Sequence, residues 1–298
     1  MIPVTERVRT KPRPHLRIQQ RHLWTWAHHS VQILFLLFLI LGRRHWFPVI
    51  KGSTSATRVL DILDLADPLG ALEVFLASRH VHLTLLLAGG ILFVFYAILG
   101  RAFCGWVCPL GLLLELNHSL REWIRRRLRR KRIRLPNYQL PKQTKYWVLG
   151  IALVLSLLTR VPAFQVLSPI NILTRNLVFG PGWGILLVVA IVAVEYVSER
   201  VWCRALCPLG AFYSLVGRFS PVRVRIDHEK ERGGPQCGLC NLRCPMGIAI
   251  VEKHVREGKD SIDDPECTRC GTCVDYCLRG SLQLGVTMPR SQAGRPDL

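Results

Sequence analysis

Seven cysteines near the C-terminal end have the spacing of iron–sulfur ligands. They form two motifs, C-x2-C-x3-C-P and C-x2-C-x2-C-x3-C, at Cys237, Cys240, Cys244, Cys267, Cys270, Cys273 and Cys277. Bacterial ferredoxins with two cubane clusters use this spacing, because three thiolates of each cluster come from one loop and the fourth comes from the other motif. The motifs therefore predict a C-terminal domain that moves single electrons.

One of the two predicted clusters has a complete set of thiolates. Its ligands, for a [4Fe-4S] cluster, would be Cys267, Cys270, Cys273 and Cys244. The second site has only Cys237, Cys240 and Cys277, because Gly234 stands where another cysteine is expected. That site holds a [4Fe-4S] cluster with a different fourth ligand, or a [3Fe-4S] cluster, or it is empty. The candidates for the fourth ligand are Asp227, His228, Glu231 and water.

Zinc is the main alternative to iron at these motifs. Zinc also binds paired C-x2-C thiolates, but it does not call for a third thiolate three residues further on. Disulfides are less favoured, because the thiols are expected on the reducing side of a membrane. The spacing therefore favours iron–sulfur clusters.

Four further cysteines occur in an internal repeat. Cys104 and Cys108 lie in F-C-G-W-V-C-P-L-G, and Cys203 and Cys207 lie in W-C-R-A-L-C-P-L-G. Residues four apart share one face of a helix, and the proline is expected to kink or end that helix. The two C-x3-C-P motifs could converge on a single four-thiolate site, act as redox-active dithiols, or pack one helix end on another. The repetition favours a functional role.

Apolar and basic residues are segregated along the chain, which is 50% hydrophobic and carries a net charge of +20. Four apolar stretches stand out, at residues 23–42, 81–99, 146–159 and 183–197. A membrane-spanning helix needs about 20 mostly apolar residues, so the first two qualify and the others span only by extending into charged ends. The pattern predicts a polytopic α-helical membrane protein with four transmembrane helices and a small α+β domain of the bacterial-ferredoxin type.

The distribution of lysine and arginine predicts an orientation for these helices. The segments before residue 23, from 101 to 145 and from 198 onward contain 6, 12 and 15 of them, whereas residues 43–80 and 160–181 contain 5 and 2. Positive loops stay inside, so both termini and the iron–sulfur domain are expected in the cytoplasm, at a bacterial inner membrane. The basic run at residues 125–132 is interpreted as contact with lipid headgroups and not with nucleic acid. No cleavable signal peptide is expected.

These expectations divide the chain into four parts. Residues 1–22 form a basic arm, residues 23–217 a four-helix membrane domain with the two repeats, residues 218–287 the ferredoxin-like domain, and residues 288–298 a tail.

Acidic residues between the first two apolar stretches and in the fourth stretch are candidates for proton transfer. Glu195 lies in the fourth apolar stretch, where it could accept a proton from a quinol or simply reach the membrane interface. Asp61, Asp64 and Asp67 recur every third residue, which predicts an amphipathic helical turn. Its acids could relay protons, dock a basic partner or be solvated.

Histidines near the first two apolar stretches are candidate haem ligands. His28 and His29 are expected at the inner end of the first span, whereas His80 and His82 are expected at the outer end of the second. Side chains at opposite ends cannot share one iron, so haem b is not favoured and these residues are interpreted as interfacial.

Together these features resemble the NapH/MauN family of membrane ferredoxin-type proteins. The resemblance rests on the four expected spans, the outer loop sequence Asp67-Pro68-Leu69, the two C-x3-C-P motifs after the second and fourth spans, and the ferredoxin-like tail. It implies that the repeat cysteines fill the family's paired motifs and that the tail cysteines fill its cluster motifs except at Gly234. For the nitrate branch it implies electron transfer from the quinol pool towards a periplasmic nitrate reductase, with a soluble polyferredoxin partner. The methylamine branch serves methylamine oxidation.

We therefore expect an iron–sulfur component of a quinol dehydrogenase, with quinol as substrate. The expected partners are membrane lipid, the quinone pool and a soluble polyferredoxin or cytochrome. Two alternatives come from other classes. A maturation factor could reduce a metal or a thiol during assembly of a respiratory enzyme, and a membrane redox sensor could use the cluster that lacks a thiolate at Gly234.

Overall fold

The computed structural model describes residues 22–43, 50–53, 56–59, 63–80, 83–129, 140–180, 182–197, 200–230 and 238–287. Several residues singled out from the sequence lie outside these ranges. They are Cys237, Gly234, Glu231, Asp61 and His82, together with the N-terminal arm up to residue 21, residues 130–132 of the basic run and the tail at 288–298.

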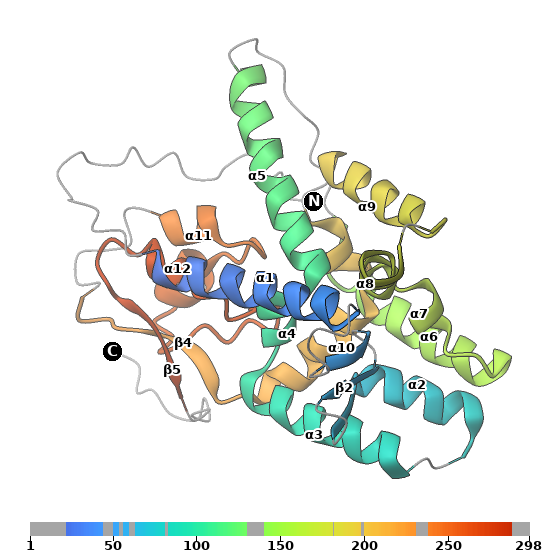
Figure 1. Cartoon of the computed structure of the whole chain (residues 1–298). Coiled ribbons are helices and arrows are strands. Elements are labelled where there is room, and N and C mark those ends of the chain that lie inside the picture. Colours follow the sequence, from blue (N-terminus) through green and yellow to red (C-terminus); the bar gives the residue numbers. More distant parts are fainter. Residues whose placement is uncertain are drawn as a thin grey trace.

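Helices make up most of the described chain, and they cross one another around the two cysteine repeats (Figure 1). The longer helices are α1 (Leu23–Arg43), α2 (Pro68–Ser78), α3 (Leu83–Leu99), α5 (Pro109–Arg129), α6 (Thr144–Thr159), α8 (Pro169–Phe179), α9 (Ile185–Val197) and α10 (Pro208–Val216). The short ones are α4 (Ala102–Trp106), α7 (Ala163–Leu167), α11 (Leu239–Arg243), α12 (Thr272–Asp275), the π-helices η1 (Trp202–Leu206) and η3 (Val251–Val255), and the 3-10 helix η2 (Gly217–Phe219).

Proline starts several of these helices. Pro68, Pro109, Pro169 and Pro208 are the first residues of α2, α5, α8 and α10. Proline suits this position, because the first N–H of a helix has no partner within the helix and the fixed φ of proline matches the helix. In α2 the preceding Asp67 completes the cap, since its carboxylate accepts a hydrogen bond from the Gly70 N–H at 3.1 Å.

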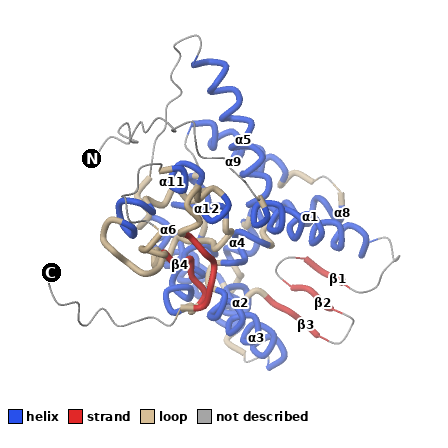
Figure 2. The backbone as a smooth tube through the Cα atoms, turned by 90° about the vertical axis from the view of Figure 1, so that its left-hand side faces the viewer, coloured by secondary structure: helices blue, strands red, loops and turns tan. Residues whose placement is uncertain are grey.

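Two small antiparallel sheets lie apart from each other (Figure 2). Strands β1 (Ile50–Ser53), β2 (Ala56–Val59) and β3 (Leu63–Ala66) form one sheet in sequential order. Strands β4 (Val222–Ile226) and β5 (Leu282–Val286) form the other, with Val224 opposite Leu284. This second sheet joins the two ends of the segment that carries the tail cysteines.

The expected amphipathic helical turn around Asp64 and Asp67 is wrong in its described part. Residues Leu63–Ala66 form strand β3, and a helix begins only at Pro68. The pairing of β3 with β2 decides the local structure, because β-strand hydrogen bonds occupy the backbone there.

The prediction of four transmembrane helices is wrong. Within the residues that the structure describes, no helix combines the length and the apolar character needed to cross a membrane. Helices α3, α6 and α9 have 17, 16 and 13 residues. At 1.5 Å per residue they are about 26, 24 and 20 Å long, which is less than the hydrocarbon thickness of about 30 Å. The 21 residues of α1 are long enough, but its first half carries His28, His29 and Gln32.

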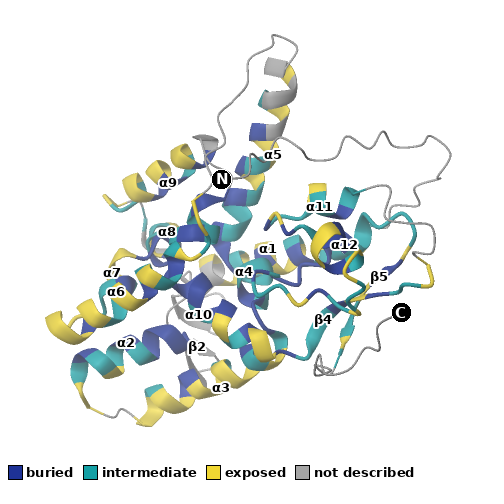
Figure 3. Cartoon of the chain, turned by 180° about the vertical axis from the view of Figure 1, so that it is seen from behind, coloured by how far each residue is buried: buried dark blue, intermediate teal, exposed yellow. Residues whose placement is uncertain are grey.

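The expected multi-pass location in a bacterial inner membrane is wrong on the same finding. The expected placement of both termini and the iron–sulfur domain in the cytoplasm depended on those spans and is wrong with it. The outer faces of α3, α6 and α9 do expose apolar side chains (Figure 3). Leu87, Ile151 and Val189 are examples from the three helices.

Two apolar cores hold the structure together. One gathers Leu110, Leu114, Leu209 and Tyr213 from the helices that follow the two repeats, and the other lies under the tail cysteines around Val224. Helix α1 joins the two regions, because Asp275 at the end of α12 accepts hydrogen bonds from Thr25 N and Oγ1, both at 2.7 Å. A carboxylate at a helix N-terminus satisfies unpaired N–H groups and complements the helix dipole.

Candidate functional site

The four repeat cysteines occupy equivalent positions in two copies of one local structure. Cys104 lies in α4 and Cys203 in η1, and each is followed by a short non-helical step at Cys108 or Cys207 before the next helix starts at proline. Cys207 has an extended backbone, and its thiol accepts a hydrogen bond from the Gly210 N–H at 3.3 Å. The second thiol of each motif therefore lies at a helix N-terminus, where N–H groups and the helix dipole favour a thiolate.

The fold brings the four repeat cysteines together. Burial raises the pKa of Cys108 above its ordinary value, and the neighbouring thiols of Cys104 and Cys207 raise it further. Burial likewise raises the pKa of Cys207 to about 11, with Cys104 adding to the effect. The pKa of Cys203 is raised by burial and then by Cys207 and Cys108. Thiols so placed lose their protons most readily to a metal that they can share.

Arg101 supplies positive charge next to these thiols. It is 1% exposed, and its Nη2 donates a hydrogen bond to the Cys203 carbonyl oxygen at 2.9 Å. Its guanidinium also interacts with the Cys104 thiol. Gly210 leaves the space for it, because a Cβ there would lie 2.7 Å from Nη2 of Arg101. A buried cation of this kind offsets the negative charge of clustered thiolates.

The tail cysteines of the predicted complete site line one cavity. Its walls include Cys244, Cys267, Cys270 and Cys273, with apolar side chains such as Val224 and Ile250. The empty space there is about 350 Å³, part of it open to solvent. Burial, and then the neighbouring thiols, raise the pKa of Cys273, and burial raises the pKa of Cys267 to about 12. The chemistry of this donor set, four thiols around an apolar cavity, fits an iron–sulfur cluster.

The second tail site is only partly described. Cys240 is buried, and Sγ of Cys277 lies 3.2 Å from Oγ of Ser281. Cys237 lies outside the described residues. Two of the candidate replacement ligands have other partners. Asp227 forms an ion pair with Lys230, in which Oδ2 lies 2.9 Å from Nζ. Nε2 of His228 donates a hydrogen bond to the Lys259 carbonyl oxygen at 3.0 Å.

The repeat site and the tail site are in direct contact. Nη1 of Arg101 donates to Oε2 of Glu266 at 2.6 Å, and Glu266 directly precedes Cys267. Lys145 also pairs with Glu266, and these two cations together outweigh burial and lower the pKa of that carboxyl. The Trp106 indole N–H donates to the Arg269 carbonyl oxygen at 3.1 Å. The loop of the tail site is thereby held against the first repeat.

Gly105 shows how closely these two segments pack. It lies between Cys104 and Cys108, and a Cβ at this position would be 3.0 Å from the Thr268 carbonyl oxygen. Thr268 lies between Cys267 and Cys270. The backbone of one motif therefore lies against the backbone of the other.

Glu195 supports the second repeat. Its carboxylate is 4% exposed and accepts hydrogen bonds from the Arg200 N–H at 2.6 Å and the Trp202 N–H at 3.4 Å. Burial raises the pKa of this carboxyl, although both hydrogen bonds oppose the shift. Glu195 thus lies at the start of η1, the helix that carries Cys203, and also interacts with that thiol.

Reasoning from the sequence missed the charged residues that connect the two sites. Arg101, Lys145 and Glu266 are separated by long stretches of chain, so no local pattern links them. One indication was available, since Arg101 and Glu266 each lie within three residues of a motif cysteine. Charged side chains are rarely buried unless they are paired.

Comparison with known proteins places the chain among iron–sulfur proteins. A family model described as a 4Fe-4S binding domain matches residues 81–136 and 179–227, the two segments that contain the repeat cysteines. The methylamine utilization ferredoxin-type protein MauN of Paracoccus denitrificans is 33% identical over 249 residues, which is 83% of this chain and 84% of that protein. The ferredoxin-type protein NapH of Escherichia coli is 31% identical over 262 residues, 86% and 87% of the two chains.

A third relative has a name that states a general role. The putative electron transport protein YccM of Escherichia coli is 31% identical over 211 residues, which is 68% of this chain and 55% of that protein. No solved structure matches the chain.

Proposed function

The chain belongs to the family of MauN and NapH ferredoxin-type proteins, and from that premise we propose that its repeat cysteines and its tail cysteines hold two adjacent iron–sulfur centres. Its role is iron–sulfur electron transfer. The resemblance inferred from the motifs is confirmed by these comparisons.

One observation carries the proposal of two neighbouring centres. The contacts from Arg101 to Glu266 and from Trp106 to Arg269 join residues beside the repeat cysteines to residues beside the tail cysteines. Adjacent redox sites that are fixed by buried hydrogen bonds keep their separation constant. A constant separation is what single-electron exchange between two sites within one protein requires.

The residues proposed as ligands have distinct roles. Cys104, Cys108, Cys203 and Cys207 would hold one cluster, and Cys244, Cys267, Cys270 and Cys273 would hold a [4Fe-4S] cluster in the tail. When bound, such clusters supply reversible one-electron reduction at a potential tuned by nearby charge and hydrogen bonds. The chain's own contribution at the repeat site is the Arg101 charge and the Gly210 N–H, which stabilise negative charge on sulfur.

We propose that the remaining tail thiolates form a third centre of unusual composition. Cys237, Cys240 and Cys277 would hold a [3Fe-4S] cluster or a [4Fe-4S] cluster with a ligand other than cysteine. Asp227 and His228 have partners within the described chain, which favours the three-thiolate form over ligation by either of them.

We further propose that a quinol is the electron donor and that partner proteins carry electrons onward. Similarity to the methylamine utilization protein MauN supports partners in that process. A reductase of the nitrate type, with a soluble polyferredoxin or a cytochrome as intermediary, is the other destination that we propose. Glu195 is the proposed proton acceptor, because its buried carboxyl has a raised pKa and lies beside Cys203. A carboxyl of raised pKa takes up a proton more readily than a carboxyl in water.

Reduction by a quinol analogue tests this function. Anaerobically purified protein is mixed with a ubiquinol or a menaquinol analogue in the presence of a soluble acceptor protein, and cluster absorbance is followed. We expect bleaching that is lost when Cys104 and Cys203 are both replaced by serine. Cys277→Ser is the matched control, because it removes a thiolate outside both proposed complete sites and should leave reduction intact. Clusters that no quinol analogue reduces would contradict the donor assignment.

A further inference from the structure

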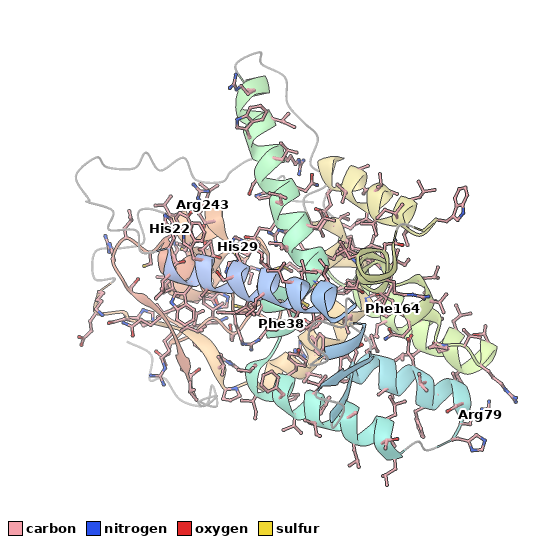
Figure 4. All side chains as sticks on the ribbon, viewed as in Figure 1. His22, His29, Phe38, Arg79, Phe164 and Arg243 are labelled. Carbon is pink, nitrogen blue, oxygen red and sulfur yellow. The ribbon has the colours of Figure 1, made fainter. Side chains whose placement is uncertain are left out.

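Helices α1 and α5 cross at His28, His29 and Glu115, and we propose that these three side chains bind a divalent transition-metal ion, separate from every cysteine. The ligand atoms of the three side chains all lie within 4.8 Å of one another. Figure 4 labels His29 on α1, close to the lower part of α5. Neither the histidines nor Glu115 belong to a cysteine motif.

The separations are close to those of a bound ion. Nε2 of His28 lies 3.7 Å from Oε2 of Glu115, and Nε2 of His29 lies 3.5 Å from Oε1. Metal–ligand bonds of about 2.0 to 2.2 Å in a tetrahedral zinc site put neighbouring ligand atoms about 3.3 to 3.6 Å apart. Both histidine–glutamate separations therefore match a bound ion to within a few tenths of an ångström, and the two histidine nitrogens lie within 4.8 Å of each other.

His28 is oriented as metal-binding histidines usually are. Its Nδ1 lies 2.9 Å from the Trp24 carbonyl oxygen. A carbonyl oxygen can only accept, so Nδ1 carries a hydrogen and Nε2 is the ring nitrogen that faces Glu115. This arrangement, in which the second ring nitrogen donates to a backbone carbonyl, fixes the tautomer and the ring orientation at metal sites.

The surroundings leave one side of the site accessible. His28 is 1% exposed and packs edge-on against Trp106, with ring centroids 6.2 Å apart. The side chains of His29 and Glu115 are 29% and 23% exposed. An ion can therefore enter from the His29 side, and a water or another small ligand can take the remaining position.

Arg200 sets the charge that an incoming ion meets. Its Nη2 lies 4.0 Å from Oε2 of Glu115. Burial alone would raise the pKa of Glu115, but the neighbouring His28 and His29 side chains and the charge of Arg200 outweigh burial and lower it. Glu115 is thus a carboxylate at neutral pH, and Arg200 competes with a metal for it.

The donor set identifies the class of ion. Two imidazole nitrogens and one carboxylate, without sulfur, suit zinc or ferrous iron and do not suit calcium or magnesium. Three protein ligands leave at least one position open. We use zinc as the probe, because it has no redox chemistry of its own.

A zinc titration of the cluster-loaded protein tests the proposal. The cysteine sites are kept filled with iron under anaerobic conditions, zinc is added, and bound metal is measured after gel filtration. We expect one added zinc per chain, with only nitrogen and oxygen neighbours in its X-ray absorption spectrum. Glu115→Gln and His29→Gln should each weaken binding more than about tenfold, because loss of a ligand costs at least as much as loss of an outer partner.

Two further variants make the result specific. His118→Gln changes a histidine that lies three residues beyond Glu115 on α5, outside the cluster, and should bind zinc like the wild type. Arg200→Gln removes the competing cation and should tighten binding. Zinc with sulfur neighbours, no added zinc, or wild-type affinity in both Glu115→Gln and His29→Gln would overturn the proposal. Unchanged cluster absorbance in His29→Gln, whose side chain is partly exposed, shows that the fold is retained.

Discussion

Arg101 donates a hydrogen bond to Glu266 at 2.6 Å, and this pair joins the two cysteine sites across a sequence separation of 165 residues. The side chains are 1% and 4% exposed, so neither charge is compensated by water. Arg101 also donates to the Cys203 carbonyl oxygen, and Glu266 also pairs with Lys145. The pair is therefore the centre of a buried network that fixes one site against the other.

Breaking this pair should destabilise the protein strongly. We expect Arg101→Gln or Glu266→Gln to lower the free energy of unfolding by about 3 kcal/mol, because each leaves a buried charge without its partner. The double variant should cost less than the sum, since the two residues are in contact. Denaturant unfolding measures these values. The control is Lys142→Gln, which breaks the partly exposed pair with Asp264 at 3.9 Å and should change stability by less than about 1 kcal/mol. Equal effects in all three single variants would contradict the network.

Ionisation of the buried Asp67 carboxyl should lower the free energy of unfolding as the pH rises. Burial raises the pKa of Asp67 to about 6, although hydrogen bonds from Tyr213 and Gly70 oppose the shift. The unfolded chain releases this proton near the ordinary value of 3.8, so the folded state binds more protons between the two values. Between pH 5 and pH 7 the wild type should lose about 1 kcal/mol relative to Asp67→Asn. Denaturant unfolding of both proteins at the two pH values checks the sign, and parallel pH profiles would contradict it.

Replacing Gly234 by cysteine should supply the thiolate that the second tail site lacks. Gly234→Cys restores the thiolate that a bacterial ferredoxin motif has at this position, so the variant should contain an ordinary [4Fe-4S] cluster in place of the unusual centre. Electron paramagnetic resonance of reduced, anaerobically purified protein would show the added signal. Glycine to serine at the same position is the control, because it adds a side chain without a thiol. A wild type that already holds two ordinary cubanes in its tail would contradict the predicted deficiency.

The cap of α1 should contribute a small, local part of the stability. Asp275→Ala removes the carboxylate that accepts the Thr25 N–H, which typically costs about 1 kcal/mol for a helix cap. The tail clusters should remain, since Asp275 does not line the cavity of the complete site. Thermal unfolding with cluster absorbance as a second readout separates the two effects. Loss of the clusters in this variant would show that Asp275 has a larger role than a cap.

A feature could be predicted from the sequence when its residues lie close together along the chain. Cysteine ligands recur at short spacings, so the repeat and the tail motifs were recognisable without a structure. The pairing of Arg101 with Glu266 and the approach of His28 to Glu115 join distant segments, and no local pattern reveals them.

The prediction of membrane-spanning helices is wrong for a different reason, because it rests on a local pattern of apolar residues. The composition of the apolar stretches predicts spans, but their helical lengths depend on where each helix begins and ends. Helix α6 ends at Thr159, where Arg160 takes a left-handed conformation with φ of 57°. Helix α9 starts only at Ile185, two residues after Trp183. At the end of α6, a left-handed capping residue and not hydrophobicity sets the length of the helix.

The central claim, that the repeat cysteines and the tail cysteines each hold iron, is tested most directly by metal content. Iron and acid-labile sulfide per chain are measured in anaerobically purified wild type, in the Cys104→Ser, Cys203→Ser double variant and in Cys267→Ser, with electron paramagnetic resonance of each. We predict that each variant loses about four iron atoms and keeps the resonance of the other site. Variants that retain the iron of the wild type, or a wild type that is colourless and loaded with zinc, would contradict the account.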